Sequence, residues 1–413
     1  MAVLALPFLT GFGQKPLVLS SIFLVACFMQ LDCRRSVIYL KKPIELKLYT
    51  TWGLWAIGTG FFMDFSAYDF YGCVKVLLRQ FFLLWSLYAI FIRQRQCSYI
   101  YWVFLGVAML QVVAVLLGFH LDRNVGEVGG EIVKDVIDLH TTRAEGLTGN
   151  ANVMGFAMLF GIWSCIMLWK GLSSRVITMA YRGVLLAAMV LMSYYAIQSG
   201  SRKTILVLVV LFFAWIVWMV PGRFSIKSVL IAFFGGVAFL IVAAAVSKYI
   251  MSETYLGARF MQLFDAGGGS ATEGFKENVR YSMYIDGFKF WLHNPIAGIG
   301  LGQFGVRHWS GMYSHSDYME PLACTGLVGF LLYHGYSLTV TMRLVRLLKR
   351  KIPPDIVYTI KGMLMFMICN HYLIGLGAPH WMGIEHNLIV VFIGTYAIRI
   401  WAEFVVYRPI YAT

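Results

Sequence analysis

Long apolar stretches separated by short polar links run through the whole sequence. Eleven of them can form helices across a bilayer, whose hydrocarbon core takes about 20 helical residues. They lie at about 16–32, 46–63, 72–92, 98–119, 150–169, 176–198, 204–220, 225–248, 321–342, 356–377 and 387–405. The stretch 2–12 is a shortened twelfth candidate. Because lipid leaves backbone groups no external partner, this pattern predicts an all-α polytopic membrane protein with 11–12 transmembrane helices.

The composition excludes most other classes of protein. Of the 413 residues, 59% are hydrophobic and 13% are charged, whereas about a quarter of the residues in soluble domains are charged. Disordered, collagen-like and small disulfide-bonded chains are excluded in the same way. The seven cysteines have no metal-ligand spacing and lie mostly in or beside apolar stretches. We therefore interpret them as buried apolar residues.

Basic residues gather in alternate links between the predicted helices. The net charge of +14 would suggest nucleic acid in a soluble protein, but cytoplasmic loops of membrane proteins also collect Lys and Arg. We therefore expect no nucleic-acid partner. The links on the basic side contain Arg34, Arg35, Lys41, Lys42, Lys47, Arg93, Arg95, Lys170, Arg175, Arg223, Lys227, Arg343, Arg346, Lys349, Arg350 and Lys351. The opposite, acidic side is predicted to face outward.

The segment 249–320 is too long and too varied in composition for a simple link. Its run from Thr272 to His293 has helical periodicity, and Pro295 followed by three glycines predicts a sharp turn. We expect a folded extramembrane cap on the outer side. The expected organisation is an N-terminal transmembrane bundle at 1–248, a large helical loop at 249–320 and C-terminal transmembrane helices at 321–413.

Five segments together resemble a known family. They are Arg143-Ala-Glu-Gly-Leu-Thr-Gly-Asn-Ala-Asn152, Ser199-Gly-Ser-Arg-Lys203, Arg280-Tyr-Ser-Met283, Asn294-Pro-Ile-Ala-Gly-Ile-Gly-Leu-Gly-Gln-Phe304 and His315-Ser-Asp-Tyr-Met-Glu-Pro-Leu-Ala-Cys-Thr-Gly-Leu-Val-Gly329. Their order is similar to that of the O-antigen ligase and O-antigen polymerase superfamily, a pattern that exopolysaccharide polymerases share. One departure is Ser316, because the family often has Asn after the key His.

This resemblance implies a metal-independent, inverting glycosyltransferase of the GT-C type at the periplasmic face of the bacterial inner membrane. The implied donor is a glycan on undecaprenyl diphosphate, and no cofactor is implied. A polymerase of this kind joins repeat units, whereas a ligase moves the finished glycan to lipid A–core. The expected partners are the lipid-linked glycan, the glycan or lipid A–core acceptor and membrane lipids, with a chain-length regulator as a further candidate.

Glycosyl transfer from a lipid diphosphate needs a base and cations. The acceptor hydroxyl must lose a proton, and the leaving diphosphate gains negative charge that cations stabilise. His315 suits the base because an imidazole has a pKa of about 6.5. Arg202 and Arg280 suit the diphosphate because guanidinium groups bind phosphate oxygens bidentately. The alternatives are a solvated loop histidine, a lipid-headgroup contact for Arg202 and an ion pair with Glu277 for Arg280.

Lys75 and Arg79 are further diphosphate candidates because they lie four residues apart on one face of a predicted helix. Their alternatives are a buried ion pair with Asp64 or Asp69, or side chains that extend to the lipid headgroups. The candidates for lining the substrate site are Arg143, Asn150, Asn152, Lys203, Arg259, Tyr318 and His386. The histidines around His386 are too loosely spaced for metal ligands, so no metal site is expected.

Three classes of function compete at this point. Within glycan transfer, the polymerase is favoured over the ligase because Ser199-Gly-Ser-Arg-Lys203 resembles polymerase versions of that segment. A glycan flippase predicts internal symmetry and helices broken at the midplane, and no repeat is visible. A scaffold predicts that Arg202, Arg280 and His315 do not converge. The sequence has no P-loop, dinucleotide fingerprint or zinc-protease motif to support other enzyme classes.

Overall fold

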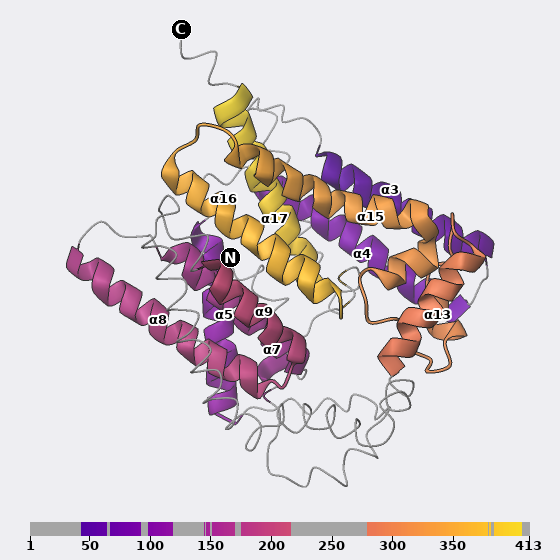
Figure 1. The fold of residues 1–413 in the computed structure, drawn as a ribbon, viewed down its shortest axis with the longest axis horizontal. Coiled ribbons are helices and arrows are strands. Elements are labelled where there is room, and N and C mark those ends of the chain that lie inside the picture. Colours follow the sequence, from indigo (N-terminus) through magenta and orange to yellow (C-terminus); the bar gives the residue numbers. More distant parts are fainter. Residues whose placement is uncertain are drawn as a thin grey trace. The chain divides into compact units, whose positions relative to one another are not determined.

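The computed structural model describes residues 43–63, 67–91, 98–118, 144, 146–148, 151–169, 175–215, 279–378, 380 and 384–406. Within these residues every regular element is helical and none is a strand (Figure 1), which confirms the predicted all-α class. The helices on predicted membrane stretches are α3 (Ile44–Met63), α4 (Ala67–Phe91), α5 (Ser98–Leu116), α7 (Ala151–Leu168), α8 (Arg175–Gln198), α9 (Arg202–Ala214), α15 (Met319–Leu348), α16 (Pro354–Phe366) and α17 (Ile384–Trp401). The predicted stretches 2–12, 16–32 and 225–248 lie outside the described residues.

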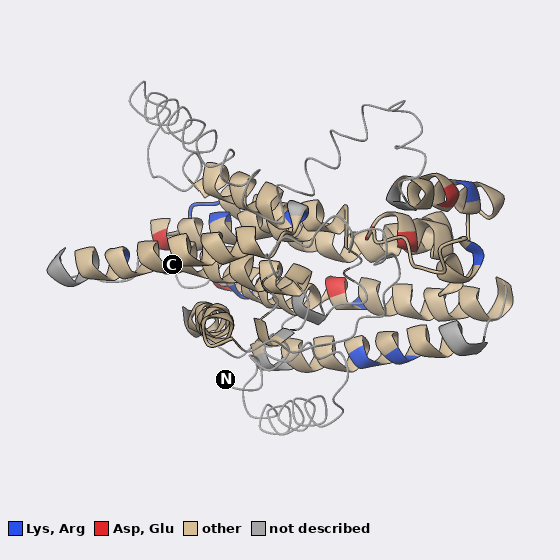
Figure 2. Cartoon of the chain, turned by 90° about the horizontal axis from the view of Figure 1, so that it is seen from below, with Lys and Arg blue, Asp and Glu red and all other residues tan. Residues whose placement is uncertain are grey.

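Six helical stretches in this part of the chain are long and apolar enough to cross a membrane. They are Phe70–Tyr88, Tyr99–Leu116, Ala151–Leu168, Met179–Gln198, Pro354–Leu373 and His386–Val405. Most of the helical ribbon carries neither acidic nor basic side chains (Figure 2), as hydrocarbon requires. The chain is therefore a multi-pass membrane protein, and the full count of 11–12 helices stays a prediction.

The chain forms two compact units that do not follow the order of the sequence. The first comprises 1–12 and 98–269, and the second comprises 13–97 and 270–413. In the first unit, α7 packs against α5, α8 and α9. Small residues permit this packing, because a Cβ on Gly155 would lie 2.4 Å from the hydroxyl of Thr204 and one on Gly161 would lie 2.5 Å from Ala108. The predicted boundaries at 248 and 320 stay a prediction.

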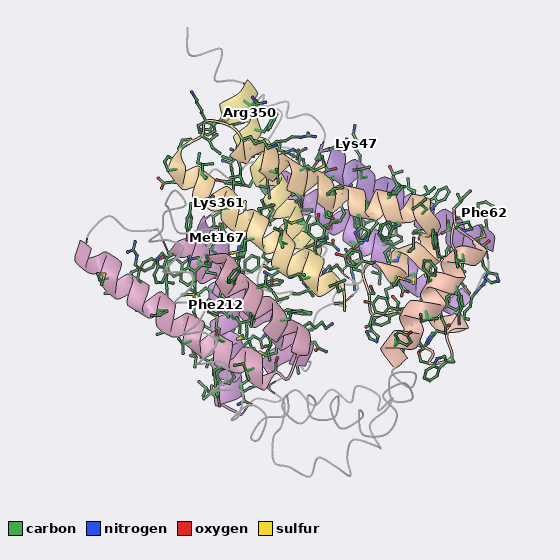
Figure 3. All side chains as sticks on the ribbon, in the orientation of Figure 1. Lys47, Phe62, Met167, Phe212, Arg350 and Lys361 are labelled. Carbon is green, nitrogen blue, oxygen red and sulfur yellow. The ribbon has the colours of Figure 1, made fainter. Side chains whose placement is uncertain are left out.

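In the second unit, α3 runs antiparallel to α15 along much of its length. The indole of Trp55 donates to the carbonyl of Thr325 at 2.9 Å, and Arg343 pairs with Glu45 near the other end of the two helices. Lys47 and Arg350 lie toward the end with the Arg343–Glu45 pair, whereas Phe62 lies at the opposite end (Figure 3). Lys47, Arg343 and Arg350, which belong to the basic residues predicted for the cytoplasmic side, therefore lie toward one end of this helix pair.

The segment before α15 folds into two helices, α13 (Val279–His293) and α14 (Gln303–Arg307). Met283 and Phe304 are buried against Ala323 and Cys324 of α15, with Phe290 and Met312 at the edge. The predicted helix at 272–293 is thus confirmed from residue 279, and 272–278 lies outside the described residues. We call residues 279–318 the cap segment.

Helix α15 is broken at Gly326, whose φ of 66° and ψ of −170° are not helical. The turn at 295–300 fills this break. Ile299 and Gly300 donate their backbone N–H groups to the carbonyls of Ala323 and Cys324 at 2.9 and 3.0 Å. Leu327 and Val328 donate in return to the carbonyls of Pro295 and Ile296 at 2.8 and 3.4 Å. These bonds satisfy groups that a helix break would otherwise leave without partners.

Candidate active site around His315

The backbone of His315 adopts a conformation that side chains rarely take. Its φ is 53°, and among the described residues it is the only one other than glycine with a positive φ. A left-handed conformation costs a residue with a Cβ about 1–3 kcal/mol. The half-buried imidazole lies 4.2 Å, between ring centroids, from the exposed ring of Tyr313. The surroundings must therefore hold this loop in place.

Upstream of His315, a buried carboxylate anchors the loop. The backbone N–H of Ser314 donates to Oε2 of Glu320 at 2.6 Å, and both residues are buried. The hydroxyl of Ser314 also accepts the N–H of Ser316 and donates to its carbonyl, each at 3.3 Å. Ser314 and Ser316 thus clamp the histidine between them.

Ser316 also binds the backbone at the start of helix α15. Its Oγ accepts the backbone N–H groups of Tyr318 and Met319, each at 3.3 Å. A side-chain oxygen near a helix start satisfies N–H groups that have no partner within the helix. Asn offers the same kind of oxygen, so the departure from the family pattern at Ser316 retains the acceptor.

Downstream of His315, Asp317 joins three elements. It is 2% exposed, and its Oδ1 accepts the phenol of Tyr333 and the backbone N–H of His380, each at 2.7 Å. Its own N–H donates to the carbonyl of Gly375 at 2.8 Å. The loop is therefore fixed to α15 and to the turn before α17.

Tyr318, a predicted substrate-lining residue, is half-buried beside this junction. Its hydroxyl donates to the carbonyl of Tyr372 at 2.9 Å, and its ring stacks on His334 at 4.9 Å. Burial, followed by the negative charge of Asp317, raises the pKa of Tyr318 to about 12. The hydroxyl therefore stays protonated at neutral pH and remains a donor.

His386, predicted to line the pocket, is buried in a stack of three imidazoles. Its ring lies 3.9 Å from that of His380, which lies 5.0 Å from that of His371. His380 Nε2 donates to the carbonyl of His371 at 2.8 Å, so this ring supports the backbone of the turn. Among the described residues, no group of His, Cys, Asp or Glu is arranged as metal ligands. The substrate contact of His386 stays a prediction.

The other predicted residues of the second unit lie on α4 and α13. Lys75 is exposed and Arg79 is half-buried, on neighbouring turns of α4 as expected from their spacing. Asp64 lies outside the described residues, so the choice between an ion pair and a diphosphate contact stays open. Arg280 lies in the first turn of α13, and the description of this residue is limited to its backbone.

In the first unit, the predicted basic segment forms a tight turn into α9. Gly200 has a φ of 64°, Ser201 is the N-cap, and Arg202 is the first residue of the helix. The ammonium of Lys203 lies 5.7 Å from the ring centroid of Phe156, and Asn152 is half-buried on α7. Arg143, Asn150, Arg259 and the side chain of Arg202 lie outside the described residues. Convergence of Arg202 with His315 therefore stays a prediction.

The fold and this loop define a class: a multi-pass helical membrane protein with a folded cap segment that leads a strained histidine into a helix. The model of the O-antigen ligase family (Wzy_C) matches residues 187–334, a little over a third of the chain. The match includes the positions of Arg202, Arg280 and His315 and ends within α15. A search of curated proteins found no match. The chain thus carries an O-antigen ligase family domain over these residues, which confirms the superfamily expected from the sequence.

Proposed function

We propose that this protein is a glycosyltransferase that moves a glycan from undecaprenyl diphosphate to an acceptor hydroxyl at the periplasmic face of the inner membrane. The carrying observation is that the family match covers a histidine held in a left-handed conformation by buried contacts on both sides. A strained backbone conformation persists only where surrounding contacts offset its cost, and such conformations cluster at active sites. The reaction is expected to invert the anomeric centre and to need no metal.

In the proposed step, His315 accepts the proton of the acceptor hydroxyl as its oxygen attacks the anomeric carbon. The bond between that carbon and the diphosphate oxygen breaks, and the diphosphate leaves with the bonding electron pair. Arg202 and Arg280, with Lys75 and Arg79, stabilise the charge that develops on it. A general base in this position contributes about 10²- to 10⁴-fold to the rate. Arg143, Asn150, Asn152, Lys203, Arg259, Tyr318 and His386 are proposed to line the substrate.

Within this reaction, we favour polymerisation of repeat units over ligation to lipid A–core. The support is the resemblance of Ser199-Gly-Ser-Arg-Lys203 to polymerase versions of that segment. The second candidate is ligation, which the description of the matched family names. The two differ in the acceptor rather than in the proposed roles of the histidine and the arginines, so the acceptor must be tested directly.

The test is glycan transfer by purified protein in detergent, without divalent metal, from a short undecaprenyl diphosphate glycan. We expect the wild type to produce a ladder of longer glycans and His315→Ala to lose about 10²- to 10⁴-fold in rate. His293→Ala, on an exposed histidine of α13, is the matched control and should retain the ladder. Transfer only after lipid A–core is added would establish the ligase. Equal rates of the wild type and His315→Ala would overturn the base assignment.

A further inference from the structure

We propose that Asp317 is the positioning residue for His315, holding the loop so that the backbone of His315 stays in its left-handed conformation and its imidazole stays in place. This inference rests on the proposed role of His315 as the base. It adds a residue for which the sequence offers no catalytic signal. Asp317 is not proposed to touch the substrate, because it is buried and its Oδ1 already accepts two hydrogen bonds.

The first partner of Asp317 is held rigidly by its own packing. The ring of Tyr333 is buried and lies 4.6 Å from the ring of Trp52 and 6.4 Å from that of Tyr49 on α3. Such close aromatic packing restricts the phenol to one orientation. The hydroxyl that donates to Asp317 is therefore a fixed point of the α3–α15 pair.

The second attachment leads to the turn at 375–380. The carboxylate accepts the N–H of His380, while the backbone N–H of Asp317 donates to Gly375, so the turn is held at both ends. The carbonyl of His380 in turn accepts the side chain of Asn387 at 2.9 Å, which ties the turn to α17. A Cβ on Gly375 would approach the Cβ of Asp317 to 3.3 Å, so little free space surrounds this junction.

These contacts begin two residues after the strained position. The clamp by Ser314 and Ser316 is local, and Glu320 belongs to the first turn of the same helix that the loop enters. Asp317 is the residue of this loop whose carboxylate binds both α15 and the turn before α17. Loss of the carboxylate would release the loop from that turn, and the left-handed conformation of His315 would no longer be enforced from its C-terminal side. A base displaced by about 1 Å loses about 100-fold in rate.

The experiment compares Asp317→Ala with Asp317→Asn in the metal-free transfer assay, with rates expressed per folded molecule. The amide oxygen of Asn can accept both hydrogen bonds, so we expect Asp317→Asn to keep kcat within about threefold. We expect Asp317→Ala to lower kcat about 100-fold while the KM for the lipid-linked donor stays within about twofold. Tyr333→Phe removes one of the two donors and should lower kcat by about fivefold, which keeps the test informative if Asp317→Ala does not fold.

Glu45→Ala is the matched control, because Glu45 is also a buried carboxylate and pairs with Arg343 near the other end of α15. It should lower the thermal unfolding midpoint without lowering kcat per folded molecule. An equal fall in kcat for Glu45→Ala and Asp317→Ala would reduce Asp317 to a general structural role and overturn the proposal. A fall in kcat for Asp317→Asn as large as that for Asp317→Ala would also overturn the proposal.

A double-mutant cycle separates failure of this inference from failure of the proposed function. If Asp317 acts through His315, adding Asp317→Ala to His315→Ala should lower the residual rate no further. An additional 100-fold loss in the double variant would contradict positioning through the histidine. Full activity of His315→Ala alone would instead remove the base assignment on which the inference rests.

Discussion

The imidazole of His308 is buried in the cap segment with a hydroxyl at each ring nitrogen. The Oγ of Ser310 lies 2.7 Å from Nδ1, and the Oγ of Ser282 lies 3.2 Å from Nε2. Nδ1 also accepts the backbone N–H of Ser310, so the neutral ring carries its proton on Nε2. Burial lowers the pKa of His308, and the negative charge of Asp286, 3.7 Å from Nε2, offsets this in part.

This lowered pKa predicts that acid destabilises the cap segment. In the unfolded chain His308 takes up a proton below its ordinary pKa of 6.5, whereas the buried ring resists protonation. Stability is therefore present above pH 6.5 and is lost as the pH falls toward the lower folded pKa. We expect the thermal unfolding midpoint of the wild type to fall more between pH 7.5 and pH 5.5 than that of His308→Gln. Above pH 7.5 the difference between their unfolding midpoints should stay constant. If the two midpoints changed in parallel over the whole pH range, the prediction would be wrong.

The residue scale also shows what the sequence could reveal about the candidate site. The family pattern allowed His315 to be predicted, because it belongs to the same ordered segment as Tyr318 and Gly329. The anchoring role of Asp317 could not be predicted from the sequence. Its partners Tyr333 and His380 lie 16 and 63 positions away, and nothing in the composition of either segment indicates that they meet.

At the scale of elements, the break in α15 and the turn at 295–300 form one structure. The turn contributes two N–H groups and two carbonyls to the broken helix, and its glycines permit the close approach. A Cβ on Gly298 would lie 2.5 Å from the carbonyl carbon of Cys324, and one on Gly326 would lie 2.2 Å from the carbonyl oxygen of Ile296. Neither position has room for a side chain.

Gly298→Ala is therefore expected to destabilise the protein by more than its backbone angle alone explains. Gly298 and Gly118 have similar φ values, 73° and 71°, but a Cβ on Gly118 would meet nothing within 4 Å. Gly118→Ala should thus report only the cost of a left-handed alanine, about 1–2 kcal/mol. The comparison is between thermal unfolding midpoints in detergent. Equal losses in the two variants would show that the contact with α15 contributes nothing.

Helices were the part of the fold that the sequence predicted well. Apolar runs of about 20 residues have few other solutions in lipid, so α5 and α7 coincide closely with the stretches predicted at 98–119 and 150–169. The break at Gly326 was not predicted, because the residues around it are as apolar as the rest of the helix. A helix break depends on the partner that satisfies its backbone, and that partner, the turn at 295–300, comes from the cap segment.

At the scale of the whole molecule, the matched domain does not coincide with a compact unit. Residues 187–334 begin in α8, which belongs to the first unit, and end in α15, which belongs to the second. The predicted cationic residue Arg202 and the predicted base His315 thus come from different units.

The proposed orientation predicts which end of α15 is reached from outside the cell. Trp309 is 68% exposed in the cap segment, and Lys351 is exposed just beyond the other end of the helix. In a background without the seven native cysteines, a membrane-impermeant thiol reagent added to spheroplasts should label Trp309→Cys but not Lys351→Cys. Permeabilised cells, in which both should react, are the control. Labelling of Lys351→Cys alone would reverse the topology.

The junction of the turn at 295–300 with α15 has a mechanical consequence. Because backbone bonds run in both directions across the break, the cap segment cannot swing on a hinge at this point without rupturing four of them together. The cap segment, which carries His315, is therefore rigidly joined to helix α15 at this point. In the proposed reaction, any motion that admits substrate to His315 must therefore come from segments other than this junction.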